Sequence, residues 1–129
     1  MIEKKARILV IEDDKDMASA IKLRLEANSF EVITAEDGIE GLEKARTENP
    51  DLIILDIMLP KVDGFKVCRM LKFDEKFNKL IIIILSAKVQ KADIDRGKEV
   101  GADAYITKPF KSEELLAKIE ELLTQRRKI

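Results

Sequence analysis

The sequence of 129 residues has no histidine, no tryptophan and one cysteine. Histidine is the commonest general base and metal ligand at neutral pH, so this chain has to use other side chains for any chemistry. The single cysteine, Cys68, excludes an intrachain disulfide and a cysteine-cluster metal site. We interpret it as a small apolar residue buried on a helix. Carboxylates, lysine, serine, threonine and tyrosine are the groups left for a functional site.

Aromatic residues are also scarce, at 5% of the chain, whereas hydrophobic residues make up 46%. We therefore expect an aliphatic core. Neither sign of charge dominates, since 24 Lys and Arg residues face 25 Asp and Glu residues. This balance argues against binding to nucleic acid or to a membrane surface through bulk charge. No apolar run is long enough for a membrane span or a signal peptide, so we expect a cytoplasmic protein.

Apolar segments alternate with helical patterns along the whole chain. The segments are residues 7–11, 30–35, 52–56, 80–85 and 104–107, and the second is the least uniformly apolar, as expected near a sheet edge. Each is followed by a helical pattern, of which 88–100 is the weakest because its apolar residues are sparse and it contains Gly97. This order predicts a doubly wound α/β fold with a five-stranded parallel sheet, (βα)5 and flavodoxin-like, and helices on both faces. We expect one domain over residues 1–129.

Polar residues lie at the carboxyl ends of four predicted strands: Glu12 and Asp13, Asp56, Ser86 and Lys108. In a parallel sheet these ends share one edge, where open α/β sheets bind ligands. Three crowded carboxylates repel one another unless a cation joins them, and an all-oxygen set favours Mg²⁺, or similarly Mn²⁺. With Lys108 and Ser86 nearby, the site can hold a metal and a phosphoryl group on Asp56 as the nucleophile. Each residue alone is commonly structural, so the interpretation depends on their joint placement.

Four motifs make the sequence resemble the receiver domain of two-component response regulators over essentially the whole chain. They are VIEDD at 10–14, LDIMLP at 55–60 with Gly64, LSA at 85–87 and YITKPF at 105–110. The resemblance implies a signalling switch and not an enzyme with a separate substrate: such domains catalyse only their own aspartyl phosphorylation and dephosphorylation. The phosphoryl donor would be a phosphohistidine on a sensor histidine kinase or a histidine phosphotransfer protein.

The resemblance also implies roles for the acidic residues. Asp56 would accept the phosphoryl group. Asp13 and Asp56 would bind Mg²⁺ directly together with the backbone carbonyl of Met58, and Glu12 would bind it through water. Lys108 would pair with the phosphoryl oxygens of the modified Asp56.

Further residues are assigned to the phosphoryl pocket and its switch in the same way. Ser86 would hydrogen-bond to a phosphoryl oxygen, next to Ala87 and Met58 in the same pocket. Tyr105 would turn inward when Ser86 moves, which would change an output surface at about 88–126. Met58 and Lys88 would border the path of the attacking water and so set the phosphoryl lifetime.

Other classes of protein fit the sequence less well. A haloacid dehalogenase-type phosphatase also uses an aspartate nucleophile and Mg²⁺, but needs a second acid where this chain has Met58. A flavodoxin-like electron carrier needs a loop rich in glycine and hydroxyl groups, and the acids at 12–14 would repel the FMN phosphate. A calcium loop from Asp14 has Ser19 in place of the required glycine. A purely structural domain leaves the polar strand ends unexplained.

Two arrangements within the family remain open. The chain is either a complete single-domain regulator, which we favour, or a receiver cut from a longer protein. The basic end at 125–129 would be the natural terminus in the first case and the start of a linker in the second. We expect a downstream effector protein or output domain as partner. We expect no direct binding to nucleic acid or membranes, and a monomer or a phosphorylation-dependent dimer.

Overall fold

A computed structural model describes residues 5–127, so the last two residues of the basic end lie outside it. Within that range strands and helices alternate strictly, in the order β1 (Arg7–Ile11), α1 (Lys15–Ala27), β2 (Glu31–Ala35), α2 (Gly38–Thr47), β3 (Leu52–Leu55), α3 (Gly64–Lys72), β4 (Ile81–Ser86), α4 (Lys91–Glu99), β5 (Ala104–Thr107) and α5 (Ser112–Arg127). The strands form one parallel sheet in the order β2-β1-β3-β4-β5. The predicted doubly wound fold is confirmed, with β2 at an edge.

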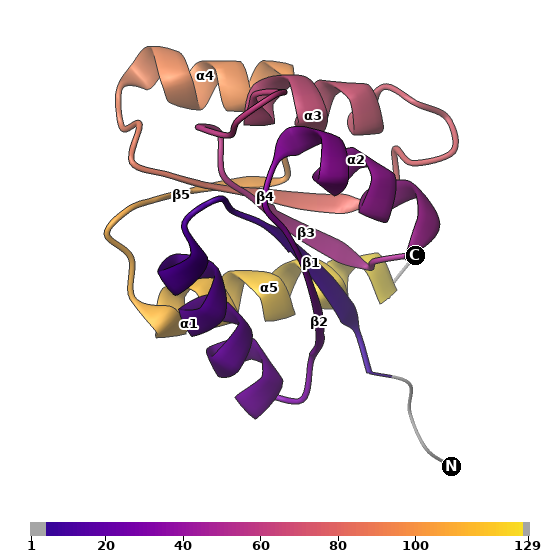
Figure 1. Cartoon of the computed structure of the whole chain (residues 1–129), viewed down its shortest axis with the longest axis vertical. Coiled ribbons are helices and arrows are strands. Elements are labelled where there is room, and N and C mark those ends of the chain that lie inside the picture. The colour runs from indigo at the N-terminus through magenta and orange to yellow at the C-terminus, as the bar shows by residue number, and fades with distance from the viewer. Residues whose placement is uncertain (1–4, 128–129) are drawn as a thin grey trace.

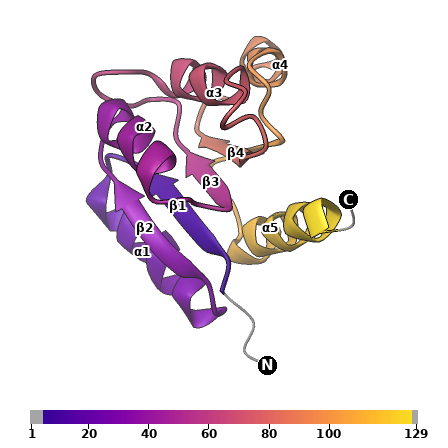
Figure 2. The same cartoon turned by 90° about the vertical axis from the view of Figure 1, so that its right-hand side faces the viewer.

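The sheet is the middle of three layers (Figure 1). Helices α1 and α5 cover one face, and α2, α3 and α4 cover the other, as the turned view also shows (Figure 2). Strand β3 is buried on both faces because its side chains alternate: Ile53 and Leu55 pack towards α2 and α3, whereas Leu52 and Ile54 pack towards α1 and α5. None of the helices in the described part of the chain is long and apolar enough to cross a bilayer.

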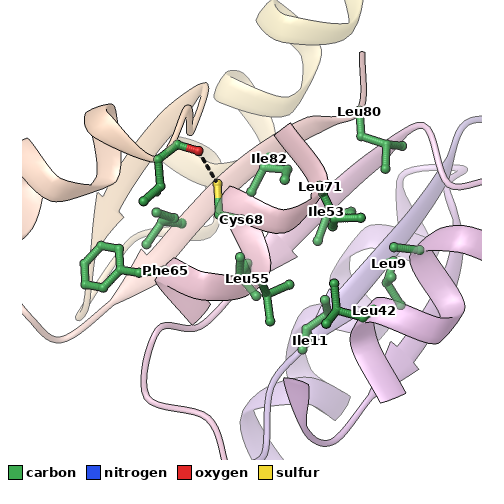
Figure 3. Packing of buried hydrophobic residues seen from close by; sticks show 14 of the residues in the cluster. Leu9, Ile11, Leu42, Ile53, Leu55, Phe65, Cys68, Leu71, Leu80 and Ile82 are labelled. Atoms are coloured by element: carbon green, nitrogen blue, oxygen red, sulfur yellow. Dashed lines mark hydrogen bonds between the residues drawn. The ribbon is translucent and has the colours of Figure 1, made fainter. Parts of the chain in front are cut away.

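The core on the α2–α3 side is aliphatic apart from Phe65 and contains Cys68 (Figure 3). Cys68 is fully buried, and its thiol donates to the carbonyl of Val100 with Sγ 3.5 Å from the oxygen. Burial disfavours the thiolate and raises the pKa of Cys68 to about 12. The interpretation of this cysteine as a buried apolar residue is therefore confirmed.

Helix α4 is shorter than the sequence pattern predicted. It begins at Lys91, after Gln90 as N-cap, so residues 88–90 belong to the loop that follows β4. The Gln90 side chain makes no capping hydrogen bond, and Gly97 is the buried residue of this helix. A helix with so little buried apolar surface is held weakly by the core.

The environment of Cys68 leads to a chemical prediction. In the folded protein the thiol should be inert to a water-soluble disulfide reagent at pH 8, because both burial and the raised pKa suppress the reactive thiolate. The same reagent should react with one thiol per chain once urea unfolds the protein. Rapid labelling in the absence of denaturant would show that Cys68 is accessible and that the α3–α4 packing is wrong.

Candidate functional site

The site lies at the carboxyl edge of the sheet, where the loops after β1, β3, β4 and β5 meet on the left of Figure 1. Hydrogen bonds continue beyond the strand ends at this edge, where the amide of Glu12 donates to the carbonyl of Ala35 (3.0 Å). The amide of Asp56 donates to the carbonyl of Ile11 (3.0 Å), and the amide of Lys108 donates to the carbonyl of Ser86 (2.8 Å). These bonds place Asp56 beside the end of β1 and Lys108 beside the end of β4.

Glu12, Asp13 and Asp56 form the predicted acidic cluster. Each offers a carboxylate oxygen, and these oxygens all lie within 4.8 Å of one another. Glu12 and Asp56 are buried, with 4% and 8% of their surface exposed, whereas Asp13 is exposed. The cluster therefore has two buried walls and one side open to solvent. Oxygen donors in this arrangement fit a hard cation such as Mg²⁺.

Lys108 reaches into the cluster from the loop after β5. Its Nζ lies 2.7 Å from Glu12 Oε1 and 3.4 Å from Asp56 Oδ2. The sequence predicts a role for this lysine only towards a phosphoryl group, so the shorter bond to Glu12 is a new finding of the structure. No local pattern could have revealed it, because the two residues are 96 positions apart.

The proximity of these groups changes their protonation. Burial raises the pKa of Glu12 to about 7, and the neighbouring Asp56 carboxylate acts in the same direction, while Lys108 partly opposes both. Burial acts to lower the pKa of Lys108, but the negative groups of Glu12 and Asp56 outweigh it and the pKa is raised. Lys108 therefore stays positively charged at neutral pH.

The loop between β3 and α3 packs directly against Asp56. The amide of Met58 donates to Asp56 Oδ1 (3.1 Å), while the Met58 side chain is 59% exposed. Gly64 closes the loop, with its amide 2.8 Å from the carbonyl of Ile57. A Cβ on Gly64 would lie 2.2 Å from the carbonyl oxygen of Asp56, so this position has no room for a side chain. The glycine noted in the sequence motif therefore allows the loop to approach the acidic cluster.

Ser86, Lys88 and Tyr105 form a second group beside the cluster. Ser86 is fully buried, and its Oγ accepts a hydrogen bond from the amide of Lys88 (3.1 Å). The Tyr105 hydroxyl donates to the carbonyl of Lys88 (2.6 Å), and burial raises its pKa. The side chains of Ala87 and Lys88 are exposed. Among the hydrogen bonds of the described residues, none joins Ser86 to Asp56.

A third group of residues, which the sequence did not predict, joins two loops near the site. Lys61, in the β3–α3 loop, lies with its Nζ 3.3 Å from Asp37 Oδ2 at the start of α2. Lys61 has a left-handed backbone conformation (φ 71°), which is uncommon for a residue with a side chain. Neither hydrophobic periodicity nor a local motif marks a contact between two loops.

Comparisons with known proteins agree with this geometry. The family model of the response regulator receiver domain matches residues 8–120. The chain is 44% identical over 117 residues to the alkaline phosphatase synthesis transcriptional regulatory protein PhoP of Bacillus subtilis, and 45% identical over 117 residues to the DNA-binding dual master transcriptional regulator RpaA of Synechocystis. Each match covers 91% of this chain but 48% of the relative, so the chain spans about half the length of these relatives.

Solved structures of receiver domains are also similar to this chain. A CheY-like response regulator receiver domain protein from Methanospirillum hungatei superposes with a TM-score of 0.91 at 30% identity, over 97% of this chain and 98% of that one. The BeF3-activated DrrB receiver domain superposes with a TM-score of 0.85 at 32% identity, over 94% and 99% of the two chains. With the family match over residues 8–120, these results show that the chain belongs to the response regulator receiver domain family, the signalling switches of two-component systems.

Proposed function

We propose that Asp56 is the phosphoryl acceptor and that its donor is a phosphohistidine on a sensor histidine kinase or a histidine phosphotransfer protein. The observation that carries this proposal is the position of Asp56, buried at the end of β3 with Lys108 and two further carboxylates around it. In the transfer, the bond between the histidine nitrogen and phosphorus breaks as a bond from an Asp56 carboxylate oxygen forms. The electron pair of the broken bond stays on the imidazole nitrogen.

Lys108 stabilises the charge on the transferred group. Its ammonium remains protonated because the surrounding carboxylates raise its pKa. In the unmodified protein it binds Glu12 and Asp56. On transfer it shifts towards the phosphoryl oxygens, which carry more negative charge than a carboxylate. Lys108 is already positioned, so little reorganisation is needed during the reaction.

The acidic cluster fits Mg²⁺, since its donors are all oxygen and lie within 4.8 Å of one another. Asp13, Asp56 and the Met58 carbonyl would hold the ion directly, and Glu12 through water. When bound, the ion supplies positive charge that offsets the repulsion between the carboxylates and the incoming phosphoryl group. Glu12 contributes less to direct binding, because its carboxylate is already paired with Lys108.

Phosphorylation then acts through Ser86 and Tyr105. Ser86, with the neighbouring Ala87, turns towards the phosphoryl oxygens and gives up its bond from the amide of Lys88. The carbonyl of Lys88 also accepts the hydrogen bond from the Tyr105 hydroxyl. A movement of Lys88 would therefore break this bond and let the Tyr105 side chain turn inward. The weakly held helix α4 follows.

The output of this switch is the surface formed by α4, β5 and α5, at about residues 88–126. Its partner is a downstream effector, either a separate protein or an output domain. Two of the relatives are named as transcriptional regulators and are about twice as long as the matched part. A kinase or phosphotransfer protein acts at the carboxyl edge of the sheet, and the effector acts on this neighbouring surface.

Replacement of Asp56 by Asn should abolish labelling by acetyl phosphate, because an amide oxygen is a poor nucleophile and the other buried carboxylate of the cluster, Glu12, is already paired closely with Lys108. Intact-mass measurement with Mg²⁺ present gives the result. Asp63→Asn is the control, since Asp63 caps α3 and Asn caps equally well, and this variant should be labelled normally. Labelling of Asp56→Asn at the wild-type level, mapped to another residue, would disprove the assignment.

Mg²⁺ affinity should depend more on Asp13 than on Glu12, because Asp13 is exposed to solvent, where an ion can reach it, while Glu12 is paired with Lys108. Asp13→Ala should weaken binding by about tenfold or more, equal to about 1.4 kcal/mol, and Glu12→Ala by less. Calorimetric titration of each variant tests this. Asp16→Asn, which removes a nearby acid outside the cluster, should change the affinity little. Equal losses for Asp13 and Glu12 would contradict the assigned roles.

The phosphoryl group on Asp56 should be long-lived, because neither Met58 nor Lys88 can orient a water as an acid or amide can. Both side chains are exposed beside the site. The double replacement Met58→Asn with Lys88→Glu should speed hydrolysis by about tenfold, since about 1.4 kcal/mol at the transition state is within reach of one oriented hydrogen bond. Decay is followed with Mg²⁺ and without kinase or phosphatase. A double variant that decays at the wild-type rate would show that this path does not limit hydrolysis.

A further inference from the structure

The loop between β3 and α3 is fastened to the start of α2 by three contacts. The first is the ion pair between Lys61 Nζ and Asp37 Oδ2 (3.3 Å). The second is a hydrogen bond of 3.3 Å from the amide of Gly38 to the carbonyl of Pro60. The third is the close approach of Gly38 to Val62: a Cβ on Gly38 would lie 2.1 Å from the Val62 carbonyl oxygen and 2.7 Å from its Cβ.

Asp37 has two partners in this arrangement. It is the N-cap of α2, and its Oδ1 accepts a hydrogen bond from the amide of Glu40 (2.8 Å). Its other oxygen faces Lys61. The hydrogen bond from the Glu40 amide and the ion pair with Lys61 both hold the pKa of Asp37 below its ordinary value. One carboxylate therefore fixes the first turn of α2 and the loop at the same time.

The fastened segment continues into the acidic cluster. Three residues before Lys61, the amide of Met58 donates to Asp56 Oδ1 (3.1 Å). Leu59 and Val62 pack on the core of the α2–α3 side, while the Met58 and Lys61 side chains are exposed. Lys61 also has a left-handed backbone, which neighbouring contacts have to maintain. The position of the Met58 amide thus depends on where residues 60–62 are held.

We propose that Asp37, Gly38 and Lys61 form a loop clamp, a set of positioning residues that holds Met58 against Asp56. The clamp keeps Asp56 Oδ1 bonded to the Met58 amide, so the other oxygen, Oδ2, is left facing Lys108 for the reaction. This inference rests on the proposed role of Asp56 as acceptor. Among the hydrogen bonds and ion pairs of the described residues, none joins Asp37, Gly38 or Lys61 to the Asp56 carboxylate, so the clamp acts only through the loop.

Two kinds of variant test the clamp: one introduces a steric clash, and the other removes the ion pair. Gly38→Ala places a methyl group against the Val62 carbonyl and should displace the loop. Lys61→Met and Asp37→Asn each remove the ion pair, and Asn preserves the cap of α2. Gly38→Ala should displace the loop more than the other two variants, because the new methyl group clashes with backbone atoms of Val62 that cannot move without moving the loop. The ion pair lost in the other two variants involves an exposed lysine and is weak.

The first readout needs neither metal nor phosphate. Amide hydrogen exchange of Met58 in the metal-free protein should become faster in all three variants, and most in Gly38→Ala. The second readout is the rate of phosphorylation by acetyl phosphate, which should fall by about tenfold in Gly38→Ala and by about twofold in the other two, since small displacements of a reacting group have large effects on rate. Mg²⁺ affinity should fall in the same order.

Matched controls separate positioning from general loss of stability. Leu42→Ala opens a cavity in the core below the same helix, and should lower the melting temperature without altering exchange at Met58. Glu31→Gln removes a partly exposed ion pair with Arg7 at the far end of the sheet and should leave every readout unchanged.

The outcomes distinguish the clamp from the acceptor assignment. If Gly38→Ala and Lys61→Met match Leu42→Ala in Met58 exchange and in labelling rate, the clamp does not exist. If Gly38→Ala fails to fold, Lys61→Met and Asp37→Asn decide by the same comparison. Labelling of Asp56→Asn would overturn the acceptor instead, and would leave the exchange result for the clamp intact.

Discussion

The ammonium group of Lys108 lies between the carboxylates of Glu12 and Asp56, and the arrangement of the site depends on this contact. Two carboxylates buried side by side repel each other and lose hydration, as the raised pKa of Glu12 shows. Removing one partner of a buried ion pair typically costs about 3–5 kcal/mol. Lys108 lies between the two acids and offsets part of this repulsion until a cation or a phosphoryl group enters.

The sheet makes this concentration of charge possible. Parallel strands end at one edge, and the hydrogen bonds from Asp56 to Ile11 and from Lys108 to Ser86 extend the register past the last strand residues. The core beneath is mainly aliphatic and buried on both faces of the sheet, so it forms a rigid base for the loops. Helix α4 buries little of its own surface and lacks a side-chain cap, so it is held less firmly than the sheet. A rigid site beside a weakly held helix suits a switch.

Much of the fold and part of the site followed from local patterns. Apolar runs bounded by polar residues predicted every strand of the described chain, and the less apolar second run was correctly expected at an edge. The acids after β1 and β3 were predicted to meet, because the carboxyl ends of parallel strands share one edge of the sheet. The start of α4 was predicted three residues too early, since sparse apolar spacing carries little information about a helix end.

The sequence by itself determined which elements form and which polar residues share the edge of the sheet, because periodicity and strand-end position are local properties. Only the tertiary structure decided how those residues pair. The bond between Lys108 and Glu12, the engagement of Ser86 and Tyr105 with the backbone of Lys88, and the contact of Gly38 with Val62 join distant segments. Such contacts depend on loop paths and on distances of tenths of an ångström, which no spacing along the chain encodes.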